Sequence, residues 1–367
     1  FQTDHPDLNG KIQFPSRFLA NRNRPNSHGT HVAGIIAAQG NNGIGICGLC
    51  QNCSLTCVDW SASDGQMWIN DAEIFFGFGY VVKAGAKVIN FSVGASGSLG
   101  EEVASFPNLY INLDAALYSC YMSALLSRGY DFICVQSAGN GNGGGHAVDA
   151  AQNTLFCSVT EANAFTPYIG ISAQDILDRI IIVGSAKLEN NKYIQASSSN
   201  VGNQVSICAP GVNIYSCVTD SDCSYKSGTS MASPHVAAIA AMVWSINPNL
   251  PAARVKQIVC TNTKDTVAIA ATRYFENLDY KAYPMVNAAL AVEAALQTVG
   301  GIHKTMNLGA DRDSTVTLTD TKGRTFEFEA DEQGNLSVVL LPDTYAVSYQ
   351  ANRQPASTSI TVSSQEA

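Results

Sequence analysis

Three short motifs contain residues that could carry out nucleophilic chemistry. In SGTSMASPH, Ser230 follows a turn of small residues and leads into an apolar helical pattern; in NSHGTHVAG, His28 opens a second helical pattern; SAGN ends in Asn140. A serine hydroxyl is a weak nucleophile, so it needs a histidine base and donors that stabilise the oxyanion formed on a carbonyl. A helix N-terminus supplies free N–H groups and a dipole that favours this negative charge. Together the motifs predict acyl-transfer chemistry, whereas each residue alone is typical of an N-cap, a surface histidine or a turn.

The elements around these motifs alternate between strands and helices up to about residue 300. Strands are predicted in GAKVINFSVGAS, RGYDFICVQSAGN, DRIIIVGSA and VSICAPGVNIYSC, and helices in the amphipathic or apolar segments between them. This order predicts an α/β fold, with a mostly parallel central sheet and helices on both of its faces. After Gly301, period-two alternation and frequent turn residues predict a small all-β antiparallel module. We therefore predict two domains, residues 1–301 and residues 302–367.

Composition limits the possible environments and partners. Of the 367 residues, 46% are hydrophobic and 14% charged, which is typical of a well-packed globular protein. There is no apolar run of about 18 residues, so no membrane span is predicted. The net charge of −9, with no basic cluster, argues against nucleic acid as a partner. Eleven cysteines, several closely spaced, favour an oxidising and therefore secreted or extracellular location.

The motifs occur in an order known from one enzyme family. The series NSHGTHVAG, KVINFSVG, SAGN, CAPG and GTSMASPHVA, over about residues 1–300, resembles that of the subtilisin-like serine peptidases. The resemblance implies an endopeptidase that hydrolyses peptide bonds through an acyl-enzyme on Ser230, with His28 as general base. It assigns the oxyanion-hole side chain to Asn140. His31 and His235 match family histidines that have no catalytic role.

The resemblance also implies a cleft for a peptide or protein substrate. Ser92, Val93 and Gly94 resemble a strand whose backbone pairs with an extended peptide, and Gly65, in the segment Asp64-Gly65-Gln66, resembles the opposite edge. Main-chain pairing of this kind accepts diverse sequences, because every peptide has the same backbone.

A pocket for the side chain before the scissile bond is implied beside this cleft. Ser137, Ala138 and Gly139 would form its wall, and their small size leaves room for a large apolar side chain. Residues 95–136 are longer than the matching family segment. They are expected either to shape the cleft or to add a surface helix.

A catalytic triad also needs a carboxylate that orients His28 and stabilises its protonated form. In the family this Asp ends a strand, and residues resembling FQTDHPDLNG follow it. Either a separate or upstream segment supplies the strand and its Asp, or the protein lacks both. We expect the first, because losing a central strand leaves buried backbone groups unpaired at about 1–3 kcal/mol each. Asp4 and Asp7 follow the motif, and neither is expected to be the triad acid.

The resemblance assigns Asp7 to a different role, in a structural Ca²⁺ site. Its carboxylate, Asn42 and the carbonyl oxygens of Ile44 and Ile46 would form an oxygen cage of the kind that Ca²⁺ prefers. The alternative is an empty glycine-rich turn.

The segment CGLCQNCSLTC, residues 47–57, has the spacing of a ferredoxin iron–sulfur motif. No proline follows its fourth cysteine, and the segment lies where the family has a loop and a strand that enters the core. Disulfides are therefore the preferred interpretation, with Cys50 and Cys53 as one candidate pair.

Four further cysteines have distinct contexts. Cys217 and Cys223 flank a predicted hairpin just before Ser230 and are a second candidate pair. Cys134 and Cys208 lie in apolar strands and are predicted to be buried free thiols or core residues.

Two other functions remain open on the same scaffold. A pseudopeptidase would keep the fold for binding or assembly without catalysis, and an incomplete triad would favour it. A peptide ligase or cyclase would need a cleft that excludes water and admits an amine.

Overall fold

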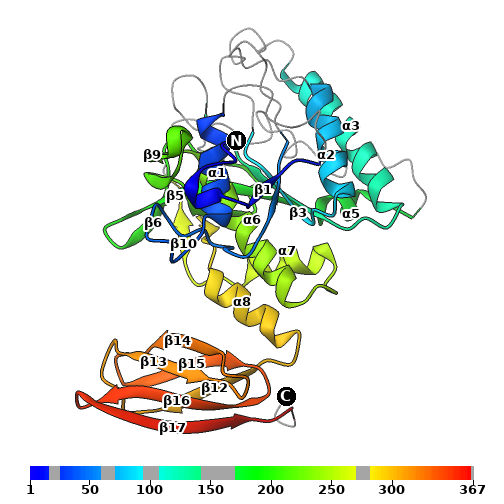
Figure 1. The fold of residues 1–367 in the computed structure, drawn as a ribbon. Coiled ribbons are helices and arrows are strands. Elements are labelled where there is room, and N and C mark those ends of the chain that lie inside the picture. Colours follow the sequence, from blue (N-terminus) through cyan, green and yellow to red (C-terminus); the bar gives the residue numbers. More distant parts are fainter. Residues whose placement is uncertain (16–24, 59–70, 94–106, 142–169, 270–281, 365–367) are drawn as a thin grey trace. The chain divides into compact units, whose positions relative to one another are not determined.

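The computed structural model describes residues 1–15, 25–58, 71–93, 107–141, 170–269 and 282–364 (Figure 1). Contacts divide the chain into two compact units. The first comprises Phe1–Met242 and Leu250–Ala288, and the second comprises Val243–Asn249 and Ala289–Ala367. This division falls at the start of helix α8 (Ala288–Gln297). The domain boundary after residue 301 stays a prediction.

A seven-stranded, mostly parallel sheet forms the centre of the first unit. Its hydrogen-bonded order is β11–β10–β6–β5–β4–β3, and β7 also pairs with β5. The β3–β4, β4–β5, β5–β7 and β6–β10 pairs are parallel, whereas β5–β6 and β10–β11 are antiparallel. The predicted α/β fold class is therefore confirmed. The strand bounds are β3 Val88–Phe91, β4 Ile133–Ser137, β5 Ile180–Glu189, β6 Lys192–Gln195, β7 Ile207–Pro210, β10 Thr266–Ala268 and β11 Ala282–Pro284.

Helices α2 (Asp71–Lys83) and α3 (Pro107–Leu126) pack against this sheet. Phe78 of α2 makes edge-to-face ring contacts with Tyr118 of α3 and with Phe132 before β4. The described part of residues 95–136 therefore consists of α3, which covers the core, followed by a short loop and most of β4. Residues 94–106 lie outside the described part of the chain.

Two of the remaining helices of the first unit, α1 and α6, carry candidate site residues. The middle and carboxyl-terminal part of α1 and the first turn of α6 share an apolar cluster that contains Val32, Ile35 and Met231. In the sequence, strands β8 and β9 follow β7 of the main sheet and precede α6, and they pair with each other as a hairpin. The bounds are α1 Ser27–Ala37, β8 Ile214–Cys217, β9 Cys223–Lys226, α5 Ala173–Leu177, α6 Thr229–Ile246 and α7 Ala252–Thr261, with short 3-10 helices at Pro6–Leu8 and Thr219–Ser221.

Two short strands lie apart from the main sheet. Strands β1 (Ile12–Gln13) and β2 (Leu55–Thr56) pair in parallel as a separate two-stranded sheet. Strand β3 ends the main sheet, and within the described residues its only strand partner is β4. Direct pairing between β2 and β3, which would have contradicted the expected extra strand, is not seen among these residues.

The second unit contains antiparallel β-sheets, as predicted for this region. Strands β12 and β15 form one sheet, and the other has the order β14–β13–β16–β17. Alternate residues such as Val316, Leu318 and Val347 face a shared apolar core with Leu336 and Val338 of the first sheet. The bounds are β12 Ile302–Asn307, β13 Thr315–Thr319, β14 Thr325–Glu329, β15 Asn335–Leu340, β16 Asp343–Ala351 and β17 Gln354–Val362.

The cysteines separate into bonded and free groups. Cys50 and Cys53 form the predicted disulfide. Two of the four cysteines of the ferredoxin-like motif are therefore not available as thiolate ligands for an iron–sulfur cluster. Cys134 and Cys208 are buried free thiols, as predicted. Cys217 and Cys223, the second candidate pair, are also free thiols in this structure, so the disulfide predicted between them is not formed here. Within the described residues, no helix has the length and apolar character that crossing a membrane requires.

Candidate active site

His28 is positioned by the first turn of α1. Asn26 caps the helix, because its Oδ1 accepts hydrogen bonds from the N–H groups of His28 (2.8 Å) and Gly29 (3.2 Å). The His28 side chain reaches the surface. Neighbouring protein atoms nevertheless remove part of its hydration and Lys226 adds positive charge, so the pKa of His28 lies below its ordinary value. Both effects favour the neutral ring, which is the state a general base requires.

The buried His31 holds the same helix against the β8–β9 hairpin. Its Nε2 contacts the carbonyl oxygens of Ile214 (3.0 Å) and Ser224 (3.1 Å), one from each strand. Because carbonyl oxygens only accept, Nε2 carries the proton. Ser216 Oγ donates to the His31 carbonyl at 2.8 Å. His31 is a positioning residue, in line with the role that the resemblance implied.

Ser230 lies in the first turn of α6 and contacts the end of β3. Its Oγ donates to the Ser92 carbonyl at 3.3 Å, and Ser92 Oγ donates to the Ser230 carbonyl at 3.0 Å. Within the described residues, no hydrogen bond joins His28 to Ser230. In this structure the Ser230 hydroxyl is therefore directed at Ser92.

Asn140 follows β4 and is fixed by the residue before Ser230. Asn140 Oδ1 accepts from the Thr229 N–H (2.8 Å) and the Thr229 hydroxyl (3.0 Å). The N–H can only donate, so the amide atom that faces it is the oxygen. The Gly139 N–H in turn donates to Thr229 Oγ1 at 3.1 Å. The Asn140 NH₂ group is left as a donor beside the N-terminus of the Ser230 helix, as an oxyanion hole requires.

A polar relay behind Ser230 was not anticipated from the sequence. Ser233 Oγ donates to Asn90 Oδ1 at 2.7 Å, and Asn90 Nδ2 donates to Ser92 Oγ at 2.9 Å. Ser92 then contacts Ser230, so the relay joins β3 to the first turn of α6. An asparagine inside the apolar strand VINF was the available signal, because polar residues within such strands need specific partners.

The predicted substrate residues are only partly described. The Val93 carbonyl accepts from Gln136 Nε2 at 3.1 Å, and the Ser92 carbonyl accepts from Ser230. Ser137, Ala138 and Gly139 are buried. Gly94 and the segment 64–66 lie outside the described residues.

The predicted calcium ligands gather around Asp7, which is fully buried. Asp7 Oδ1 accepts from Asn42 Nδ2 (2.7 Å), and Oδ2 accepts from the Ile46 N–H (2.8 Å). The loop wraps the carboxylate so closely that a Cβ on Gly45 would lie 1.8 Å from Oδ2. Residues 39–47 line an open concavity of about 330 Å³. A carboxylate and several loop oxygens suit Ca²⁺, but Asn42 presents its nitrogen to Asp7 here and would have to turn its oxygen toward an ion.

This arrangement of fold and site matches a known family. The model of the subtilase family matches residues 1–289. Together with the α/β sheet and the positions of His28, Asn140 and Ser230, the match shows that the chain belongs to the subtilase family.

Several curated proteins resemble the chain. A thermophilic serine proteinase of Bacillus sp. strain AK1 is 34% identical over 253 residues, covering 67% of this chain and 50% of that protein. Subtilisin-like protease 1 of Plasmodium falciparum is 30% identical over 261 residues, covering 69% and 34%. Thermitase of Thermoactinomyces vulgaris is 31% identical over 296 residues, covering 80% and 85%. The chain thus spans half or less of the first two relatives.

Solved structures support the fold. A cold-adapted subtilisin-like serine proteinase aligns with a TM-score of 0.50 at 22% identity, covering 77% of this chain and 83% of that one. Fervidolysin from Fervidobacterium pennivorans, a keratinolytic enzyme related to subtilisin, aligns with a TM-score of 0.54 at 18% identity, covering 97% and 55%.

Proposed function

We propose that the protein is a serine endopeptidase that cleaves peptides or proteins through an acyl-enzyme on Ser230. The observation that supports this most strongly is the fixed orientation of Asn140: Thr229 holds its oxygen, which leaves its N–H groups as donors beside Ser230. Ser230 Oγ attacks the scissile carbonyl, and His28 takes its proton and later gives it to the leaving amine. Asn140 and the free N–H groups of the first turn of α6 stabilise the oxyanion. Water then hydrolyses the ester.

The triad acid is proposed to come from a further strand between β2 and β3. The support is topological, because the β1–β2 sheet and β3 are not paired with each other among the described residues. An Asp at the end of such a strand would accept from His28 Nδ1 and stabilise the imidazolium. The strand would belong to an adjoining segment or to a separate fragment.

Labelling with a fluorophosphonate tests the proposed peptidase. The preparation must be shown by mass spectrometry to contain a polypeptide with an Asp strand that co-purifies with residues 1–367. We expect one adduct, on Ser230, and none in Ser230→Ala. Because that substitution removes only a hydroxyl, its melting temperature should match the wild type. Absence of an adduct on Ser230 in a correctly folded preparation would favour the pseudopeptidase.

A hydrolysis assay separates peptidase from ligase. A labelled peptide substrate is incubated with the protein, with and without a millimolar amine nucleophile. The products are then identified by mass. Hydrolysis products should dominate in both cases. A preponderance of the amide product would instead favour the ligase or cyclase.

We also propose that the loop around Asp7 binds a structural Ca²⁺, with Asn42 and the carbonyls of Ile44 and Ile46 as further ligands. The support is the buried carboxylate and the close wrap of the loop. Chelator should lower the melting temperature of the wild type but not of Asp7→Asn. Equal melting temperatures of the wild type with millimolar Ca²⁺ and with chelator would exclude the site.

The cellular location is proposed to be extracellular. The Cys50–Cys53 disulfide supports this proposal, because such bonds persist in oxidising compartments. Fractionation of cells that make the protein, followed by immunoblotting of cells and medium, tests it.

A further inference from the structure

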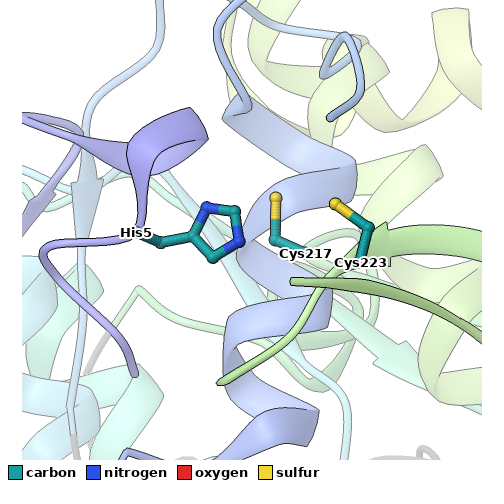
Figure 2. A group of neighbouring side chains, drawn as sticks. All are labelled: His5, Cys217 and Cys223. Carbon is teal, nitrogen blue, oxygen red and sulfur yellow. The ribbon is translucent and has the colours of Figure 1, made fainter. Parts of the chain in front are cut away.

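Outside the candidate active site, one cluster joins an imidazole and two thiols. Figure 2 shows the His5 ring directed toward Cys217, with Cys223 beside it. One nitrogen of His5 and the two sulfurs all lie within 4.8 Å of one another. His5 and Cys217 are buried, and Cys223 is half-buried. Such a set could be a metal site or a dithiol that forms a disulfide.

The hydrogen bonds of His5 decide against a metal. Its Nδ1 accepts from the Asp7 N–H at 3.1 Å, so Nδ1 carries a lone pair and Nε2 carries the proton. Nε2 then donates to the Asp222 carbonyl at 3.0 Å. A histidine ligand also donates from one nitrogen, but it binds the metal through the lone pair of the other, and in His5 that lone pair accepts from Asp7. His5 therefore holds the loop between the two cysteines and offers no lone pair to an ion.

The hairpin places the two cysteines where a disulfide can form. Cys217 of β8 lies directly opposite Cys223 of β9 in the antiparallel register. At the next position the Val218 N–H donates to the Asp222 carbonyl at 2.8 Å, which marks a hydrogen-bonded pair. Bonded and non-bonded pairs alternate, so the cysteines occupy a non-hydrogen-bonded pair, where opposing side chains approach most closely.

The same hairpin supports the helix that carries His28. Beyond the His31 bonds to both strands, Gly34 of α1 approaches β8 so closely that an added Cβ would lie 2.3 Å from Ser216 Oγ and 2.9 Å from Cys217 Sγ. Cys217 also packs with Ala33 of α1 and with Ala38, the C-cap of that helix. A covalent closure of the hairpin therefore acts on the surface that positions α1.

We propose that Cys217 and Cys223 form a reversible disulfide that locks the β8–β9 hairpin under the His28 helix. The thiolate of the more exposed Cys223 attacks a small-molecule disulfide such as oxidised glutathione and displaces one thiol. Cys217 then attacks the mixed disulfide and displaces the second thiol, so the two cysteine protons end on the two released thiols. Only the link to His28 rests on the proposed function.

The test uses the full-length Ser230→Ala protein equilibrated with oxidised and reduced glutathione, then acid-quenched and alkylated. Peptide mapping should show Cys217 joined to Cys223 at oxidising ratios and both alkylated after excess dithiothreitol. Cys134 and Cys208 should remain thiols throughout. Hydrogen exchange of the β8 and β9 amides should be at least about 10-fold slower in the oxidised protein, because the closed loop restricts opening. The amides of the first turn of α1 should slow by a smaller factor.

Cys223→Ser is the matched control, and its exchange should not respond to the glutathione ratio. Alkylation of both cysteines at an oxidising ratio would overturn the proposal, as would equal hairpin exchange in the two states. Zinc added to the reduced protein should not be retained. Retention of one zinc per chain that is lost in His5→Gln would establish a metal site instead. None of these readouts uses peptidase activity, so their failure leaves the proposed function standing, and failure of fluorophosphonate labelling leaves this inference standing.

Discussion

The two units of the chain bury different kinds of side chain. The core of the second unit is apolar, and Asp320 is the only buried polar residue among its described positions. Asp320 accepts from the N–H groups of Lys322 (3.0 Å) and Arg324 (2.8 Å) and so closes a turn. The other buried polar residues of the described chain all belong to the first unit, including His31, Thr229 and Ser233.

This difference suggests that buried apolar residues mainly stabilise the fold, whereas buried polar residues mainly position the side chains of the candidate site. Burying a polar group costs free energy unless it is hydrogen-bonded, so a core built only for stability avoids such groups. In the first unit many of them lie near the candidate site, where their directional bonds orient His28, Asn140 and Ser230. Substitutions of these polar residues should therefore change catalysis more than stability, and substitutions in the apolar core of the second unit should do the opposite.

The largest expected effect is the loss of turnover in Asn140→Ala. This substitution removes the side chain by which the first unit donates a hydrogen bond to the oxyanion. Losing one oxyanion donor lowered kcat about 10²–10³-fold in a subtilisin, and we expect a similar loss with little change in KM. Asn140→Asp keeps the oxygen that Thr229 holds but lacks the N–H donors, so it should lose at least as much activity. Steady-state kinetics on a peptide substrate measure both. Near-normal turnover of either variant would show that Asn140 does not face the oxyanion.

In the second unit, Leu318→Ala should destabilise without altering turnover. Leu318 is fully buried, and its truncation leaves a cavity that costs about 2–5 kcal/mol of unfolding free energy. Denaturant unfolding measures the loss, with exposed Thr315→Ala as the control expected to change it by less than about 0.5 kcal/mol. A large fall in kcat of folded Leu318→Ala would contradict the expectation that substitutions in the core of the second unit affect stability and not catalysis.

A smaller effect is expected from the relay behind Ser230. Asn90→Ala removes the bonds to Ser92 and Ser233, which should lower kcat about 10-fold, the equivalent of one or two hydrogen bonds. Ser92→Ala breaks the next link of the same relay. The double variant should therefore lose less than the product of the single losses. Fully multiplicative losses would mean that the two residues act independently.

The smallest expected effect is a shift of the pH profile. Lys226 lowers the pKa of His28, after the larger contribution of desolvation. Lys226→Met should raise that pKa, so the acidic limb of kcat/KM should move to higher pH, and the shift should be smaller at high salt. Lys187→Met, whose ammonium pairs with Glu189, is the control and should leave the profile unchanged. A shift to lower pH would contradict the assignment of His28 as the base.

Much of the fold could be predicted because local pattern and global structure agree. The apolar strands VINF and ICVQS form β3 and β4, and the alternating residues after Gly301 form antiparallel strands. Ser230 and His28 could be identified because both lie at helix starts whose turn and capping residues are local in sequence. The Cys50–Cys53 disulfide is also local, since its partners lie three residues apart.

The orientation of the site depends on contacts between distant segments. Asn140 is held by Thr229, 89 residues away, and Asn90 is held by Ser233, 143 residues away. His31 is fixed by carbonyls 183 and 193 residues away, and His5 by a carbonyl 217 residues away. The sequence alone determines which residues begin helices, which strands are apolar and which residue types could react, because these depend on neighbours along the chain. Only the tertiary structure decides that the Asn140 oxygen is held and its NH₂ group is left to donate, where the Ser230 hydroxyl points and why His5 offers no lone pair to a metal. Hydrogen-bond direction depends on the partner that folding brings into place, and no local pattern encodes that partner.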